Sequence, residues 1–136
     1  MNRIVVEECE GVVWVVVVQA DSTIRLLSFS RTQPVLQQRC TIHFPMKGVV
    51  TSVLWSAERH ALWYGDSLGG VHWVRLAEGE SLEVVSHQCL KRHGRIPVCA
   101  LAVKKDMVWS GGHDGRIVPI RINWDTWEWE SQTAIT

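Results

Sequence analysis

The side chains best suited to metal binding in this sequence are its four cysteines and six histidines, and their spacing indicates what they can do. The tightest group is His87, Cys89 and His93. Structural zinc sites usually combine one close pair of ligands with a second close pair, and no second pair accompanies this group. The other cysteines are isolated along the chain: Cys9, Cys40 and Cys99. We therefore expect buried thiols and loop histidines, without a metal ion or another cofactor.

A second candidate for chemistry is the segment that holds Ser110, His113 and Asp114. Nucleophilic catalysis needs a serine, a base and an orienting acid in line, and these groups usually come from separated segments. The Gly-x-Ser-x-Gly pattern is absent, and neither a helix nor a Lys-Ser/Thr pair follows Gly111 and Gly112 to form a phosphate loop. We expect Asp114 to accept backbone hydrogen bonds in a turn, and we predict no catalytic residue.

Basic residues gather in one short segment, residues 91–95. We expect it to connect two repeated units and to project on the same face as Lys47 and His113. Connecting loops often bind partners, and Arg and Lys pair well with carboxylates and phosphates. We predict a surface for an acidic peptide or a phosphate-bearing protein partner, formed by Lys47, Arg92, Arg95 and His113. The alternative is a solvated loop.

The end of the chain is rich in tryptophan, in residues 123–130. In a strand, alternation puts Trp127 and Trp129 on one face and Glu128 and Glu130 on the other. The tryptophan pair either packs on the neighbouring strand or forms an exposed aromatic anchor for a partner. The second alternative adds Trp127 and Trp129 to the candidate partner-binding residues.

Composition indicates one ordinary globular domain. The chain has 136 residues, 46% hydrophobic and 21% charged, and fourteen basic side chains balance fourteen acidic ones. This balance argues against nucleic acid as a partner. The longest apolar run, residues 12–18, is too short for a transmembrane segment, and Glu7 and Glu8 interrupt the apolar stretch behind residues 1–3, unlike a signal peptide. We expect a cytoplasmic protein with reduced cysteines.

The sequence repeats itself. Three apolar blocks are centred on Trp14, Trp63 and Trp109, at spacings of 49 and 46 residues, and each is followed by a turn and a second apolar run. Two β-rich runs joined by a tight turn predict a hairpin. We expect these tryptophans, with Trp55 and Trp73, to fill the spaces between units, each indole N–H finding a partner.

One more strand is expected before each hairpin and a more polar one after it. The preceding strands lie near residues 4–6, 50–55 and 98–103, and the following ones at 35–42, 82–87 and 127–135. No stretch has the 3.6-residue period of a helix. We predict an all-β fold, a partial β-propeller of about three four-stranded antiparallel blades, at roughly 1–45, 46–91 and 92–136.

Residues 49–76 resemble one WD40 repeat without a gap, and residues 93–122 resemble another. The resemblance implies that His93, Ser110 and Asp114 correspond to the family's histidine, strand serine and turn aspartate. The usual Trp-Asp ending is replaced, by Val74-Arg75 in one repeat and by Ile120-Arg121 in the next. The family's hydrogen-bond network of His, Ser, Asp and Trp can therefore be complete in no blade.

The stretch from Gly11 to Leu26 is similar to the propeller of JNK-interacting scaffold proteins. The three blade repeats, together with the absence of a catalytic arrangement, favour a non-catalytic protein-protein interaction or scaffold module. One alternative is the propeller portion of a larger signalling enzyme, such as an inositol-polyphosphate 5-phosphatase or a GTPase regulator. Another is an architectural role, in which the chain supplies blades to a partner's ring.

The length bears on closure of the ring. Propellers typically need four to eight blades, and three leave two sheet faces open. We expect completion by self-association, by a partner or by sequence beyond this chain.

Overall fold

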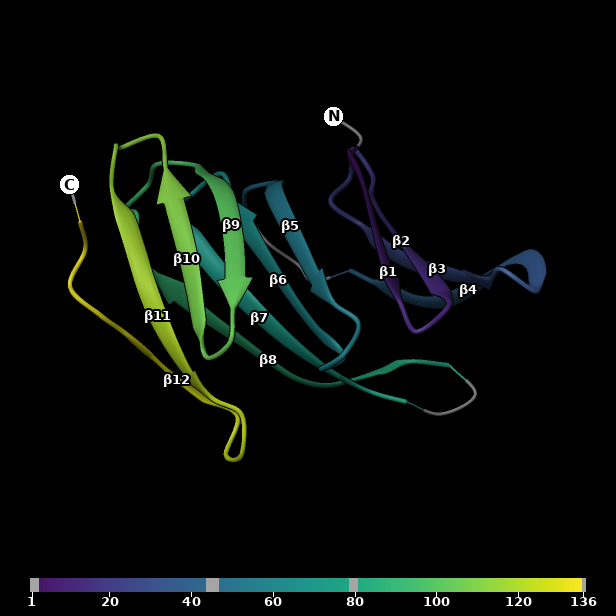
Figure 1. The fold of residues 1–136 in the computed structure, drawn as a ribbon. Coiled ribbons are helices and arrows are strands. Elements are labelled where there is room, and N and C mark those ends of the chain that lie inside the picture. The colour runs from purple at the N-terminus through teal and green to yellow at the C-terminus, as the bar shows by residue number, and fades with distance from the viewer. Residues whose placement is uncertain (1–2, 44–46, 79–80, 136) are drawn as a thin grey trace.

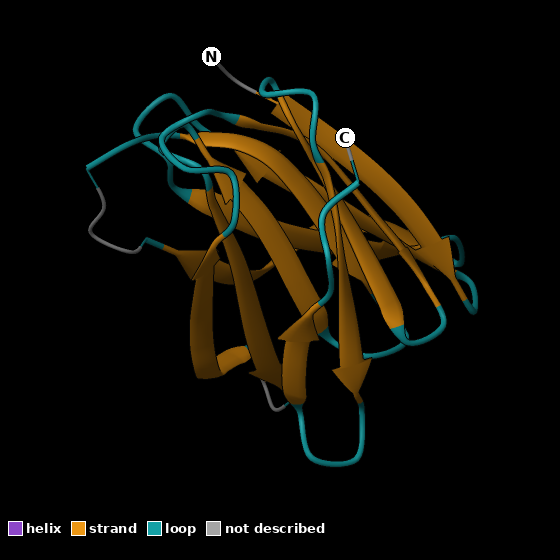
Figure 2. Ribbon diagram, turned by 90° about the vertical axis from the view of Figure 1, so that its left-hand side faces the viewer, coloured by secondary structure: helices purple, strands orange, loops and turns teal. Residues whose placement is uncertain are grey.

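Every regular element is a β-strand in the parts of the chain that the computed structural model describes, which are residues 3–43, 47–78 and 81–135. Strands in these ranges form three four-stranded antiparallel sheets, each built from four strands consecutive in sequence (Figure 1). The all-β prediction is confirmed (Figure 2). No helix in these ranges is long and apolar enough to cross a membrane. The expected boundary at residues 45–46, and Met1 and Asn2, lie outside the described residues.

The first sheet contains, in order, β1 (Arg3–Cys9), β2 (Val12–Val18), β3 (Ile24–Ser30) and β4 (Gln33–Ile42). Valines surround one tryptophan in β2, and β-branched side chains favour a strand. Glu10 and Gly11 join β1 to β2 with φ values of 50° and 80°. Two consecutive left-handed residues match the twist of the flanking strands, so this is a tight hairpin.

The second sheet contains β5 (Val50–Ser56), β6 (Ala61–Asp66), β7 (Gly70–Ala77) and β8 (Glu83–Lys91). The third contains β9 (Val98–Lys104), β10 (Met107–Gly112), β11 (Ile117–Asn123) and β12 (Glu128–Ser131). Every residue of β6 is buried, whereas β4 and β8 are mostly exposed. The more polar and exposed outer strand expected in each unit is therefore present in the first two sheets.

The last strand is shorter than predicted. Trp127 lies outside β12, in the turn after β11, with a φ of 57°. Beyond Ser131 the pairing continues only as an isolated bridge between Ile117 and Ile135. The left-handed turn at Trp127 is the local reason that the strand begins one residue later.

The sheets stack face to face, with the second between the other two (Figure 1). We call the face turned toward the next sheet along the chain the front, and the opposite face the back. The front of the first sheet packs on the back of the second, and the ring centroids of Trp14 and Trp55 lie 5.2 Å apart there. The same cluster also contains Val16, Val18, Ile24, Leu26, Leu62, Tyr64, Val74 and Leu76.

The front of the second sheet packs on the back of the third. Trp63 and Trp73 stack with centroids 6.2 Å apart and planes 7° apart, and Trp124 meets each of them edge-on at 5.9 Å. The other fully buried side chains of this cluster are aliphatic: Ala61, Val71, Val98, Val108, Val118, Ile120 and Ile122.

Two expectations about the tryptophans are wrong. The indole N–H groups of Trp55, Trp63 and Trp73 are buried and have no hydrogen-bond partner among the described residues. Trp109, expected between units, lies on the front of the third sheet and is 38% exposed. Apolar and aromatic contacts, rather than hydrogen bonds, therefore hold the buried indoles.

Trp63 is fully buried between the second and third sheets and contributes a large ring to their contact. We expect Trp63→Ala to lower the free energy of unfolding by about 3–5 kcal/mol, because it removes a large ring and leaves a cavity. Urea unfolding followed by circular dichroism measures this. Val35→Ala, at a position 69% exposed on β4, is the control and should change stability by less than about 0.5 kcal/mol. Equal losses for the two variants would contradict the prediction.

Candidate functional site

A pocket of about 360 Å³ lies where the segment before β5, the β6–β7 turn and the β8–β9 connection meet. It is lined by Lys47, Leu68, Lys91, Gly94 and Arg95, and we call it the basic pocket. All five residues are exposed. Lys47, Lys91 and Arg95 form no ion pair with any acidic residue in the described part of the chain. Three positive charges therefore face one pocket, and no acidic side chain among the described residues pairs with them.

Asp66 fixes the turn that carries Leu68. Its Oδ1 accepts hydrogen bonds from the backbone N–H groups of Leu68, at 2.8 Å, and of Gly70, at 2.9 Å. Its Oδ2 lies 2.6 Å from Nε2 of His72 on β7. Burial acts to raise the pKa of Asp66, but the hydrogen bonds from His72, Gly70 and Leu68 outweigh it, so the pKa lies below its ordinary value. Asp66 is therefore a carboxylate that holds the turn.

His72 is the charged partner of this carboxylate. Burial acts to lower the pKa of His72, but the interactions with Asp66 and Cys89, first of all the hydrogen bond to Asp66, outweigh it and raise the pKa to about 9. At neutral pH the imidazole ring is therefore protonated, and both of its nitrogens donate. Asp66 and His72 form a buried ion pair directly behind the turn.

Three further side chains surround His72. Its Nδ1 lies 2.9 Å from Nε2 of His87, and the Tyr64 hydroxyl lies 3.1 Å from the same Nε2 atom. Burial and the positive charge of His72 lower the pKa of His87, which stays neutral, so its Nε2 accepts a hydrogen bond from the Nδ1–H of His72. Burial raises the pKa of Tyr64, which keeps its hydroxyl proton. Cys89 Sγ lies 3.7 Å from Nε2 of His72.

A second polar network holds the other side of the basic pocket. His93 Nε2 lies 2.9 Å from the Ser110 hydroxyl, and its Nδ1 lies 3.2 Å from Asp114 Oδ1. Serine, histidine and aspartate in this order have the arrangement of a catalytic triad. However, His93 is 1% exposed and Ser110 is 0% exposed, which leaves no access for a substrate. The network instead ties the β8–β9 connection to the third sheet, and the partner of Ser110 is His93 rather than His113.

The two turns beside the basic pocket touch at Gly69. Its φ is 87°, and a Cβ at this position would lie 2.2 Å from the carbonyl oxygen of Gly94. The carbonyl of Gly69 also accepts a hydrogen bond from the backbone N–H of His93, at 3.3 Å. Only glycine permits both this φ and this approach. The absence of a side chain at position 69 therefore sets the spacing of the two turns.

The structure brings two of the predicted partner-binding residues, Lys47 and Arg95, together in the basic pocket. Arg92 is half-buried and lines no part of it, and its Nε has no hydrogen-bond partner among the described residues. His113 is exposed on the β10–β11 turn, outside the pocket. Lys91, the last residue of β8, belongs to the same basic segment and lines the pocket. Strand alternation, which turns Lys91 outward, is the signal that points to it.

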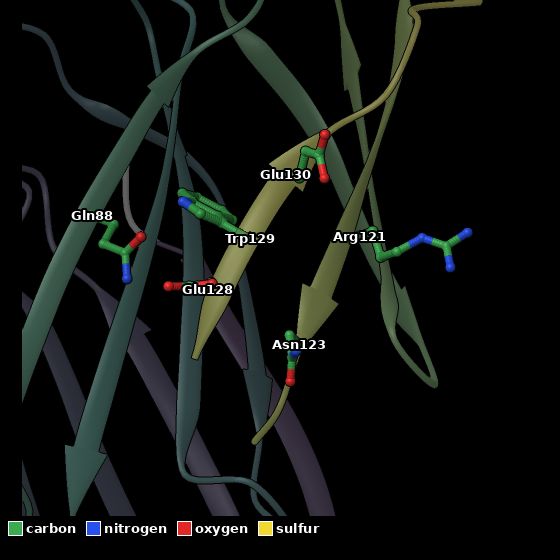
Figure 3. Close-up of a pocket in the computed structure, with 6 residues that line it drawn as sticks. All are labelled: Gln88, Arg121, Asn123, Glu128, Trp129 and Glu130. Atoms are coloured by element: carbon green, nitrogen blue, oxygen red, sulfur yellow. The ribbon is translucent and has the colours of Figure 1, made fainter. Parts of the chain in front are cut away.

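The two candidate tryptophans lie elsewhere, against the second sheet. Trp127 stacks on Trp73 at 5.3 Å with the Arg75 guanidinium 4.4 Å from its ring centroid, and Trp129 is tilted on Trp73 at 5.3 Å. Both are half-buried, as in the packed alternative. Trp129 also lines an open hollow of about 550 Å³, where it points toward the strand of Gln88 (Figure 3). Binding of a partner by these two residues stays a prediction.

The cysteines do not match the expectation of buried thiols. Cys89 and Cys99 are exposed, and Cys9 and Cys40 are half-buried. All four are free. Among the described residues, no group of three or more His, Cys, Asp or Glu side chains is arranged to hold a metal ion.

Three stacked four-stranded meanders, with the connections of neighbouring sheets meeting at a basic pocket, define a segment of a β-propeller. Among solved structures, the chain is similar to the β-propeller domain of Cps50 (Swd1) from Myceliophteria thermophila, with a TM-score of 0.60 and 14% sequence identity. The match covers 89% of this chain and 41% of that chain, so this chain spans about two fifths of the length of the matched propeller chain. At this identity the likeness shows the fold alone. No family model and no curated protein matches the sequence.

The ion pair of His72 and Asp66 predicts how stability depends on pH. The folded protein binds the His72 proton more tightly than the unfolded chain does, whose pKa is near 6.5. The stabilisation is therefore fully present below pH 6.5 and is lost as the pH rises through about 9. We expect a loss on the order of 2 kcal/mol, after discounting for solvent screening. Urea unfolding between pH 6 and pH 10 measures it.

His72→Gln should flatten this alkaline decline. His113→Gln, which changes an exposed histidine, is the matched control and should retain it. An unchanged pH profile in His72→Gln would rule out the ion pair as the cause.

The contact at Gly69 gives a second prediction. Gly69→Ala should lower the free energy of unfolding by at least about 2 kcal/mol, because strain at positive φ adds to a clash with the Gly94 carbonyl. Gly94→Ala has a φ of 62° but no atom within 4 Å of the new Cβ, so it should cost only about 1 kcal/mol. Thermal unfolding of both variants separates clash from strain, and equal losses would contradict the close approach.

Proposed function

We propose that this chain is a non-catalytic protein-interaction module whose basic pocket binds an acidic segment of a protein partner. The observation that carries the proposal is the convergence of Lys47, Lys91 and Arg95 on one pocket without an acidic partner among the described residues. Charge-assisted hydrogen bonds from such groups bind carboxylates and phosphates strongly. Leu68 adds an apolar contact beside the charges.

The fold supports this proposal. Loops positioned by a rigid scaffold are the usual binding surfaces of proteins, and two internal networks hold the turns of this pocket in place. The buried position of Ser110 supports a role without catalysis. The resemblance of residues 11–26 to JNK-interacting proteins supports a scaffold role, and the free cysteines suit a cytoplasmic location. If the chain is instead the propeller portion of a larger signalling enzyme, we expect it to bind its partner through the same basic pocket.

The proposal predicts binding of a labelled peptide that carries a phosphoserine flanked by glutamates, measured by fluorescence anisotropy. We expect Arg95→Ala and Lys91→Ala each to raise the dissociation constant about tenfold, since each removes a hydrogen bond to a charged group. Binding should also weaken as salt rises, because the pocket is exposed.

Two comparisons make this test specific. Lys104→Ala removes an exposed lysine on β9 outside the basic pocket and should leave binding unchanged. The same peptide with serine in place of phosphoserine shows whether carboxylates suffice or phosphate is required. Failure of both peptides to bind, or equal effects of Arg95→Ala and Lys104→Ala, would overturn the proposed function.

A further inference from the structure

The front of the third sheet is open, and Trp109 marks it. Trp14, Trp63 and Trp109 lie on the second strand of their respective sheets, and the first two point to the front. Trp14 and Trp63 are covered by the next sheet and are 5% and 0% exposed. Trp109 is 38% exposed, and its neighbour Val108 points to the back, into the cluster with the second sheet. Trp109 is therefore the front residue of a seam that this chain does not complete by itself.

The back of the first sheet is the complementary open face. Val5 and Cys9 on β1 pack toward the second sheet, so alternation turns Ile4 and Val6 to the back. Ile4 is 65% exposed and Val6 is 62% exposed. Val13 on β2, beside Trp14, faces the same way. An exposed patch of large aliphatic side chains on a sheet face indicates an interaction surface.

The strand registers show that these two faces match the seams already formed. On the second sheet Val53 pairs across to Tyr64, one residue after Trp63. On the first sheet Val6 pairs across to Val15, one residue after Trp14. Val6 thus occupies the place of Val53, which is buried in the seam that covers Trp14. The chain therefore carries the two faces that a further seam needs: an uncovered front on the third sheet and an uncovered back on the first.

The charges on the two faces are compatible with contact. Arg121 and Glu130 are paired neighbours on the third sheet, and both are exposed. On the first sheet Glu8 and Arg31 form an exposed ion pair at 2.5 Å. Each face thus carries charges of both signs beside its apolar surface. The two faces can therefore meet with positive groups placed opposite negative ones.

We propose that two copies of this chain bind each other front to back, with Trp109 of each copy seated on the back of the first sheet of the other. Two such contacts join three blades to three and give a closed ring of six, within the range of four to eight that propellers use. A second copy is the occupant because it supplies the face that is equivalent to those covering Trp14 and Trp63. The proposal is independent of the basic pocket, which lies on other residues.

Light scattering of the purified chain tests the proposal. We expect twice the mass of one 15.5 kDa chain at about 100 µM, a concentration well above the dissociation constant of a specific dimer. Trp109→Glu and Val6→Glu should each give monomers at this concentration, because in a dimer of either variant both contacts bring a carboxylate into an apolar seam and raise the dissociation constant above about 100 µM. Both positions are exposed, so circular dichroism should show an intact fold. Val85→Glu, at an exposed valine on β8, should leave the dimer unchanged.

Mixing the two monomeric variants distinguishes a front-to-back contact from other dimers. The third sheet of the Val6→Glu chain and the first sheet of the Trp109→Glu chain are both intact, so the mixture should regain association through one seam. Absence of association in the mixture, or loss of the dimer in only one of the two variants, would overturn the front-to-back contact. A monomeric wild-type chain would also overturn it and would assign the open faces to another protein or to further blades of a longer chain.

Discussion

The stacking of one sheet on the next is the interaction on which the rest of this structure depends. No helix in the described ranges covers a sheet, so an apolar face leaves water only by meeting another sheet. Each buried tryptophan removes about 150–250 Å² from water, roughly 4–6 kcal/mol at about 25 cal/mol per Å². This exceeds the cost of about 1–3 kcal/mol for an indole N–H without an acceptor. Trp63 and Trp73 are therefore stable in the seam without hydrogen bonds from their indoles.

The basic pocket depends on the same stacking. The hydroxyls of Thr51 and Ser52, on β5, donate to the carbonyl oxygen of Val98 at 2.6 Å and 3.1 Å, which ties the second sheet to the third. Lys47 precedes the second sheet, and Arg95 lies in the connection to the third. Lys47 and Arg95 both lie outside the strands, so they meet Lys91 at the pocket only when the second and third sheets are packed against each other.

Most of the fold follows from local patterns, because each hairpin joins strands adjacent in sequence and alternation marks the buried side of each strand. The places and order of the twelve strands could therefore be predicted, but not all of their ends: β8 runs on to Lys91, and the last strand begins after the left-handed turn at Trp127 and stops at Ser131. The polar network around His72 could not, because it depends on the register that sets β8 beside β7 and brings His87 across. The basic segment at residues 91–95 could be recognised from its charge. The burial of Arg92 could not, because Arg92 lies in a connection between strands, where no periodic pattern indicates which side chains are buried.

Of the three described sheets, the second is the only one that is covered on both faces. Resistance to local unfolding should therefore differ between the sheets. In a stack of repeated units each unit contacts only its neighbours, so opening an outer sheet breaks one seam and opening the second breaks two. Amide protons of β6 and β7 should then exchange with solvent only on global unfolding, whereas β1 and β12 exchange through partial openings. Protection would fall from the middle of the chain toward both ends, and the molecule would unfold from its flanks inward.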